Sequence, residues 1–384
     1  MILKMEGTNC YRDQPDEIKE KIVSLVFEEF ERMNKYKRRI SYEEIARIIT
    51  EKTGVRVRRN TIWRWLNGEN IPMGTKRHKV PRRAPDEDAQ IVRGLSITDL
   101  NVIYQRYTIR LKVNTTKDFF AHRMQRFFSR YGWTMVKPVL DDNMTWWHLV
   151  AHLDTKSWIR ELEKPVKELT NEERLKLLSG AISGDGCIAV THTDRKHVWF
   201  AIKLYNGKRE TIKTIHQVFK SLTIPYGFAR LYDANEIHII EGRIIKSTQH
   251  IIKSRRPMYV FTVTERNAVE YLLKNLRLLQ PFREVKRILA LRFIKKDKID
   301  RDLVKPVWDW LRVIEKTSTI RSIIRACELI PDERFAERIL DKQQILKELH
   351  RRLHEYADRV RELRQEATKI INMLRAASPP SLFP

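Results

Sequence analysis

Cysteine is scarce in this chain, and long apolar runs are missing from it. The three cysteines among 384 residues, Cys10, Cys187 and Cys327, are scattered and odd in number. Such a set offers neither a disulfide framework nor a cysteine zinc site, which is typical of a reducing interior. No run of about 18 apolar residues occurs, and the first residues lack the apolar core of a signal peptide. We therefore expect a cytoplasmic protein without membrane contact, nucleoid-associated if it is prokaryotic.

Acidic residues are also in short supply, since 49 of them face 75 lysines and arginines, for a net charge of +26. The commonest partner of so basic a protein is nucleic acid. The alternative is the ion-pair-rich surface of a thermophile, but that would enrich both signs. The length and the 42% hydrophobic content predict a globular chain of two to four domains.

Residues 1–68 are predicted to form a small helical domain. Ser41–Glu44 has the pattern of a capping box, Gly54 ends that helix, and Asn60 is placed to cap a second helix over Thr61–Leu66. Helix, glycine turn and helix at this spacing indicate a helix-turn-helix; a three-helix bundle with a basic surface is the alternative. The residues expected to contact DNA from the second helix are Arg58, Arg59, Thr61 and Arg64.

Residues 69–86 form a linker interrupted by prolines, with a series of basic side chains. A stiff basic connector can follow phosphates or lie in a minor groove, or it can be a solvated tether. Its candidate DNA contacts are Lys76, Arg77, Arg82 and Arg83.

Two nine-residue segments repeat one pattern in the middle of the chain. Residues 178–186 read LSGAISGDG, and residues 92–100 read VRGLSITDL. Each predicts an apolar helix with a glycine at its third position (Gly94, Gly180) and an aspartate at its eighth (Asp99, Asp185). Two such helices can pack closely at the glycines, so that both carboxylates lie side by side and can hold a divalent cation.

This pattern resembles the LAGLIDADG motif of homing endonucleases. The resemblance implies an α+β fold of two αββαββα repeats, here 87–168 and 169–298, which form saddle-shaped antiparallel sheets in one pseudo-symmetric chain. It also implies that Gly94 and Gly180 pack the motif helices, and that Asp99 and Asp185 are the metal-binding acids. The first copy ends in Leu100 where the family usually has glycine.

The strand over 106–113 alternates basic or hydroxyl side chains with apolar ones. A sheet laid along a major groove needs such a strand, although a half-exposed antiparallel strand is the alternative. The residues expected on its open face are Arg106, Thr108, Arg110 and Lys112. The corresponding residues of the second repeat are His197, Trp199 and Lys203.

Phosphodiester hydrolysis needs an activated water and stabilisation of charge on the phosphoryl and leaving oxygens, which divalent metals can supply. The cation expected at Asp99 and Asp185 is Mg²⁺ (or Mn²⁺), helped by carbonyls at the motif-helix ends. By resemblance, Arg283 or Lys286 is the basic catalytic residue. Asn206 or Gly207 stands where the family often has glutamine.

Residues 299–384 are predicted to be helical. Apolar residues recur at alternating steps of three and four over 346–374, a coiled-coil pattern. The coiled coil either pairs two subunits into a homodimer or folds back on 320–329 within the chain.

The function expected is sequence-specific double-stranded DNA binding with metal-dependent cleavage, as in a homing endonuclease. The alternative is a cleavage-inactive DNA-binding regulator or genome-organising protein on the same scaffold. The Leu100 departure, the missing glutamine and the coiled coil favour that alternative. An RNA-processing role is a more distant one.

Overall fold

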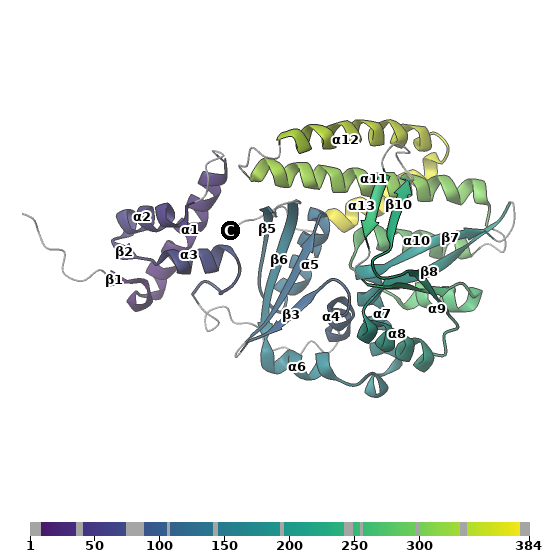
Figure 1. Ribbon diagram of the computed structural model, residues 1–384, viewed down its shortest axis with the longest axis horizontal. Coiled ribbons are helices and arrows are strands. Elements are labelled where there is room, and N and C mark those ends of the chain that lie inside the picture. Colours follow the sequence, from purple (N-terminus) through teal and green to yellow (C-terminus); the bar gives the residue numbers. More distant parts are fainter. Residues whose placement is uncertain are drawn as a thin grey trace, which may run out of the picture.

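The computed structural model describes residues 9–35, 41–73, 88–105, 108–140, 145–192, 196–241, 249–253, 256–295, 299–330 and 336–376. Within them the chain forms an N-terminal helical unit, two α/β repeats and three C-terminal helices (Figure 1). The expected α+β class is confirmed by two four-stranded antiparallel sheets flanked by helices. No helix among these residues is long and apolar enough to cross a membrane.

The N-terminal helical unit, which we define as described residues 9–35 and 41–73, contains α1 (Asp16–Lys35), α2 (Tyr42–Thr53) and α3 (Arg59–Leu66). Ser41 caps α2, and Gly54 ends it at a φ of 67°. The expected cap at Asn60 is wrong, because α3 begins two residues earlier than predicted, at Arg59, with Arg58 at its N-cap. A short parallel pair of β1 (Asn9–Cys10) and β2 (Val55–Arg56) joins the segment before α1 to the turn between α2 and α3.

The first repeat begins with α4 (Ala89–Ser96) and continues through β3 (Asn101–Tyr104), β4 (Thr108–Thr115), α5 (Asp118–Ser129), β5 (Gly132–Leu140), β6 (Thr145–Asp154) and α6 (Thr155–Glu163). Its strands lie in the order β3-β4-β6-β5. Alternate side chains of β4 and β6, such as Leu111 and Leu149, pack against α5 in one hydrophobic core.

The second repeat has the same order with one insertion. It runs through α7 (Asn171–Asp185), β7 (Gly186–His192), β8 (Val198–Asn206), α8 (Arg209–Ser221), β9 (Gly227–Tyr232), β12 (Met258–Val263), α9 (Arg266–Asn275) and α10 (Pro281–Ile294). The strand order, β7-β8-β12-β9, matches that of the first sheet. The insertion is a hairpin, β10 (Ile237–Glu241) with β11 (Gln249–Lys253), and its tip lies outside the described residues.

The two repeats meet where α4 crosses α7. A Cβ on Gly180 would lie 2.9 Å from the Cα of Gly94, and a Cβ on Gly94 would lie 2.9 Å from the Cα of Gly180. Each such Cβ would also collide with a carbonyl oxygen of the other helix, that of Ile91 or Leu177. The glycines therefore pack the motif helices backbone to backbone, as the sequence predicts.

Three helices follow the second repeat: α11 (Arg301–Leu329), α12 (Ala336–Ala357) and α13 (Arg361–Ala376). Leu349 of α12 packs against Val313, Ile320 and Ile324 of α11. The later apolar positions, among them Ala367 and Ile371 of α13, join the core of the second repeat. The 346–374 pattern therefore folds back within the chain, and the expectation of a coiled-coil homodimer is not supported.

The N-terminal helical unit lies against the strands of the first sheet (Figure 1). Met135 of β5 and Val150 of β6 belong to its hydrophobic core rather than to that of the repeat. Gly68, just after α3, is so close to β6 that a Cβ there would lie 2.9 Å from Cγ2 of Val150. The face of the sheet opposite α5 is thus an interface within the chain.

Candidate metal centre and nucleic-acid surface

Asp99 and Asp185 come together below the crossing of the motif helices. Asp185 is the last residue of α7, and Asp99 follows α4 by three residues. Asp99 is exposed, whereas Asp185 is half-buried. Burial, and then the neighbouring charge of Asp99, raises the pKa of Asp185 to about 6. Two carboxylates so placed repel each other, which is the condition that a bound cation relieves.

Asn206, at the end of β8, lies where the resemblance places a polar strand-end residue. Its side-chain amide donates a hydrogen bond of 2.8 Å to Oδ2 of Asp185, and its oxygen accepts one of 2.8 Å from the backbone N–H of Lys208. Because both ends of the amide have partners, its orientation is fixed. Asn206 therefore positions the Asp185 carboxylate.

Two serines in the second motif hold the loop that leads into α10. The Ser179 hydroxyl accepts a hydrogen bond of 3.1 Å from the backbone N–H of Arg277, and the Ser183 hydroxyl accepts one of 2.8 Å from that of Leu279. Each hydroxyl donates in turn to a carbonyl one turn back in α7. These serines thus fix where α10 begins.

Arg283, in the first turn of α10, uses its guanidinium to close the end of α7. It donates to the carbonyl of Ile182 at 3.0 Å and also to those of Ser183 and Gly184. Burial lowers its pKa. Three carbonyls in the last turn of α7 thus accept a hydrogen bond from Arg283, which holds this turn beside the carboxylate pair.

Lys286, one turn further along α10, faces a half-buried carboxylate, that of Glu315, from the C-terminal helices. Its Nζ lies 3.8 Å from Oε2 of Glu315 in α11. Glu315 also accepts hydrogen bonds from Lys117 and from the Gln280 amide at 3.0 Å. Burial alone would raise the pKa of Glu315, but the charges of Lys117 and Lys286 hold it at about 2.

Lys208 is a residue of this site that the sequence analysis missed. It is the N-cap of α8, its Nζ donates to the Thr98 carbonyl at 3.3 Å, and it lines a cavity of about 370 Å³ together with Asp99. Lys117, the N-cap of α5, is its equivalent in the first repeat. Lys117 lies five residues after Lys112, and Lys208 lies five residues after Lys203. Lys112 pairs with the residue two positions after Asp99, and Lys203 pairs with the residue two positions after Asp185. Aligning the two repeats would have revealed this pair.

The oxygen donors suit a hard divalent cation with few protein ligands. Within the described ranges no group of three or more His, Cys, Asp and Glu residues occurs, so Asp99 and Asp185 stand without a third acid. Mg²⁺ is commonly bound by one or two carboxylates and completes its shell with water. Burial and, after it, the charge of Asp99 raise the pKa of Asp185, and the charge of a bound cation would offset the repulsion by Asp99.

The open face expected for the first sheet is covered. Thr108 and Arg110 are buried, and Glu69 of the N-terminal helical unit accepts hydrogen bonds from Arg110 and, at 2.9 Å, from Lys112. Burial alone would raise the pKa of Glu69, but these two bonds lower it. Thr108 and Arg110 therefore do not stand on an open sheet face as expected, and Lys112 is half-buried there; their contact with DNA stays a prediction. Arg106 lies outside the described residues.

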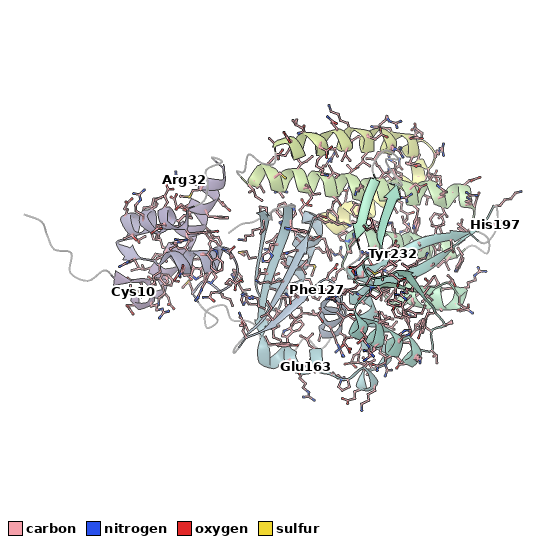
Figure 2. The ribbon with its side chains drawn as sticks, in the orientation of Figure 1. Cys10, Arg32, Phe127, Glu163, His197 and Tyr232 are labelled. Carbon is pink, nitrogen blue, oxygen red and sulfur yellow. The ribbon has the colours of Figure 1, made fainter. Side chains whose placement is uncertain are left out.

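The second sheet leaves more of its surface exposed. Strand β9 is exposed along Gly227–Leu231, and Lys203 of β8 is partly exposed. Trp199 is buried, with the Arg266 guanidinium 4.7 Å from its ring centroid, so it does not stand free on this face as expected. Figure 2 places His197 and Cys10 at opposite ends of the molecule's long axis. His197, an expected DNA contact of the second repeat, thus lies far from the N-terminal helical unit, which begins next to Cys10.

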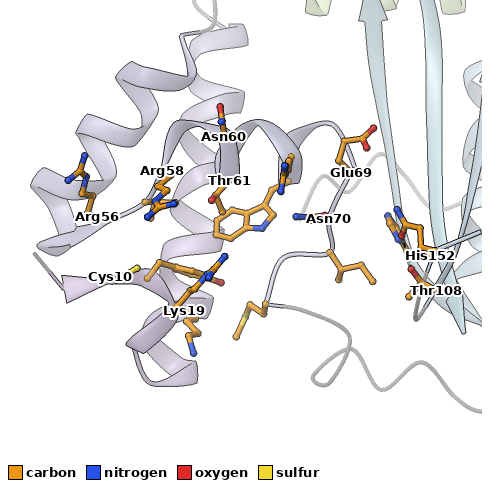
Figure 3. Close-up of a pocket in the computed structure, with 18 residues that line it drawn as sticks. Cys10, Lys19, Arg56, Arg58, Asn60, Thr61, Glu69, Asn70, Thr108 and His152 are labelled. Carbon is orange, nitrogen blue, oxygen red and sulfur yellow. Dashed lines mark hydrogen bonds between the residues drawn. The ribbon is translucent and has the colours of Figure 1, made fainter.

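The N-terminal helical unit brings three of its four expected DNA contacts to one place. Arg58, Thr61 and Arg64 line a cavity of about 920 Å³ between this unit and the first sheet (Figure 3). Arg59 lies instead near Glu43, at 3.7 Å. The linker contacts, Lys76, Arg77, Arg82 and Arg83, lie outside the described residues.

No protein-family model matches the chain, and no curated protein matches it. The solved structures that resemble it include LAGLIDADG proteins. I-DmoI in complex with DNA and Ca is 12% identical, with a TM-score of 0.32, over 50% of this chain and 91% of that one. Full-length DUF199/WhiA from Thermatoga maritima is 13% identical, with a TM-score of 0.34, over 78% and 94%. The meganuclease I-AabMI bound to uncleaved DNA is 11% identical, with a TM-score of 0.29, over 53% and 92%.

Proposed function

We propose that this protein binds double-stranded DNA and cleaves it in a reaction that depends on a divalent cation held by Asp99 and Asp185. The observation that carries the proposal is the pair itself. Two repeats of one chain place two carboxylates side by side, and the pKa of one is raised by burial and by the other. The net charge of +26 supports a polyanionic substrate.

Three residues around the carboxylate pair have separate roles. Asn206 orients the Asp185 carboxylate, and Arg283 holds the end of α7 in place. Lys208, exposed beside Asp99, is placed to stabilise negative charge on a phosphate brought to the pair. When bound, the cation supplies an activated water and stabilises charge on the phosphoryl and leaving oxygens.

A second candidate function is favoured by the half-buried Glu315. It engages Lys117 and Lys286, and Lys286 is one of the two residues expected to act in catalysis. A lysine held by an internal carboxylate is not free for a phosphate. A cleavage-inactive DNA-binding protein, such as a regulator, would keep the fold and the glycine crossing without needing that lysine.

Cation binding and cleavage are tested separately. Titration with Mg²⁺ or Mn²⁺ by calorimetry should show binding that is lost in Asp185→Asn and in Asp99→Asn. Incubation with flanking genomic DNA and a randomised plasmid library should then give double-strand breaks that vanish in the same variants.

A matched control is Asp233→Asn, an exposed aspartate at the end of β9 that takes no part in the site. Breaks that persist in Asp185→Asn would contradict the assignment of the pair. Tight, salt-sensitive duplex binding without breaks in either metal would establish the second candidate instead.

A further inference from the structure

The cavity between the N-terminal helical unit and the first sheet is lined mainly by basic and polar side chains. On one wall stand Arg12 and Lys19, together with the α3 side of the unit; on the other stand Thr108 and His152 of the sheet. Figure 3 shows Arg58 and Thr61 on the helical unit and Thr108 and His152 on the sheet across the open space, with Arg56 further from the sheet. Both walls are needed to enclose the space.

Four arginines of this cavity, Arg12, Arg56, Arg58 and Arg64, make no ion pair with any residue that the structure describes. They are exposed at the cavity, so their charges are solvated rather than neutralised. The one carboxylate in the lining, Glu69, is turned to Arg110 and Lys112 of the sheet. Converging guanidinium groups without a carboxylate are the arrangement that binds phosphate.

The sheet-side wall is held in place by three consecutive residues after α3. Lys137 donates to the Asn67 side-chain oxygen at 2.9 Å, His152 Nε2 donates to the Gly68 carbonyl at 2.9 Å, and Glu69 accepts from Arg110 and Lys112. Trp133, Met135 and Val150 add apolar contact beside them. The same turn therefore ends α3 and sets the width of the cavity.

We propose that this cavity binds the phosphodiester backbone of one strand of duplex DNA, and that it exists only while the N-terminal helical unit is docked on the first sheet. The proposal rests on the proposed function for its ligand. It gives the first sheet a different role from the second, since its face supports a DNA-binding wall instead of entering a groove.

The alternative outcome is that docking blocks DNA. In that case the Glu69 carboxylate pairs with Arg110 and Lys112, which DNA would otherwise contact. Releasing the N-terminal helical unit from the sheet would then strengthen DNA binding. The two arrangements predict opposite changes in duplex affinity for one substitution, Glu69→Lys. This substitution removes the ion pairs with Arg110 and Lys112 and adds positive charge.

The first arm compares Glu69→Lys with Glu51→Lys, an equal charge change at an exposed site on α2. Duplex affinity is measured by fluorescence anisotropy at several salt concentrations. If docking builds the site, Glu69→Lys weakens binding by about tenfold or more despite its added charge, because several phosphate contacts are lost together. Glu51→Lys leaves binding unchanged or slightly tighter. Tighter or equal binding by Glu69→Lys overturns the proposal.

The second arm leaves the docking contacts intact. The double variant Arg12→Gln/Arg56→Gln should reduce the slope of log affinity against log salt by about 1.8, from about 0.9 for each phosphate contact. Arg47→Gln, an exposed arginine of α2, is the control and should keep the wild-type slope. A wild-type slope in the double variant overturns the cavity as the phosphate site.

The same data separate this inference from the proposed function. A wild-type protein that shows no salt-sensitive duplex binding overturns the proposed function itself. A wild-type protein that binds duplex DNA while the double variant keeps its slope overturns only the cavity. Tighter binding to RNA of the same sequence overturns the choice of DNA. A Glu69→Gln variant with native near-ultraviolet circular dichroism and weaker binding confirms that loss of docking, not unfolding, is measured.

Discussion

The two repeats share a strand order but differ in what covers their sheets. In the first, the face opposite α5 is occupied by the N-terminal helical unit, and Thr108, Arg110 and Lys137 are buried there. In the second, β9 is exposed and Lys203 is partly exposed. Equivalent strands in a duplicated fold therefore need not contact the same partner. The identity of the neighbour, not the alternation of the strand, decides which role each face takes.

A second difference separates the surroundings of the two motif aspartates. Lys208 stands exposed beside Asp99, whereas its equivalent Lys117 is drawn to the half-buried Glu315. The C-terminal helices thus change only one side of the pseudo-symmetric centre. If cleavage occurs, the two strands of a duplex meet unequal chemical surroundings.

The largest expected effect on stability is at the glycine crossing of α4 and α7, to which both repeats contribute. Gly94→Ala and Gly180→Ala should each lower the free energy of unfolding by about 3 kcal/mol or more, because the added methyl meets backbone that cannot rotate away. Urea denaturation followed by circular dichroism measures this. Gly227→Ala, whose methyl would meet only the Thr262 oxygen at 3.8 Å, is the control. Unequal losses of unfolding free energy in Gly94→Ala and Gly180→Ala would show that the two glycines do not contribute equally to the crossing.

Glu315→Gln should act nearly as strongly, lowering the free energy of unfolding by about 3 kcal/mol, since the mostly buried Lys286 is left without a counter-charge. The folded-state pKa of Glu315, about 2, lies below its ordinary value of 4.5. Its contribution is therefore fully present above pH 4.5 and is lost as the pH falls towards 2. Denaturation at pH 7 and pH 3 should show a gap between wild type and Glu315→Gln that narrows in acid. A constant gap would contradict the ion pair.

The sheet faces are compared directly by Lys112→Gln and Lys203→Gln. Loss of the bond from Lys112 to Glu69 should weaken docking of the N-terminal helical unit by about 1.5–3 kcal/mol, as for a hydrogen bond to a charged group. Lys203→Gln should leave stability within about 0.5 kcal/mol. Hydrogen exchange of α3 amides measures docking. Equal protection of α3 in the two variants would contradict the difference between the faces.

The smallest expected effect concerns the paired lysines. Lys117→Gln should lower the free energy of unfolding by about 1–2 kcal/mol, because Glu315 loses a charged donor. Lys208→Gln, at an exposed position, should change it by less than about 0.5 kcal/mol. Thermal denaturation of both variants checks this. Equal losses of stability in Lys117→Gln and Lys208→Gln would show that the contact with Glu315 does not distinguish Lys117 from Lys208.

The carboxylate pair and the glycine crossing could be predicted from the sequence because both depend on local spacing. Gly94 and Asp99 are separated by the same number of residues as Gly180 and Asp185, so one helical geometry serves both. The partner of Lys286 could not be predicted in this way. Glu315 is 29 residues further along the chain, in a helix whose own periodicity says nothing about α10.

Local pattern thus determined the repeats, their helices and strands, and the place of each aspartate in its motif, because periodicity and turn residues act over a few neighbouring positions. Tertiary structure alone decided which sheet face is covered, whether the 346–374 pattern pairs within or between chains, and which lysine meets a carboxylate. These outcomes depend on contacts between distant segments, such as Glu69 with Arg110 or Leu349 with Ile320. An alternating strand specifies that it has a polar face, and the neighbour that packs there decides what that face binds.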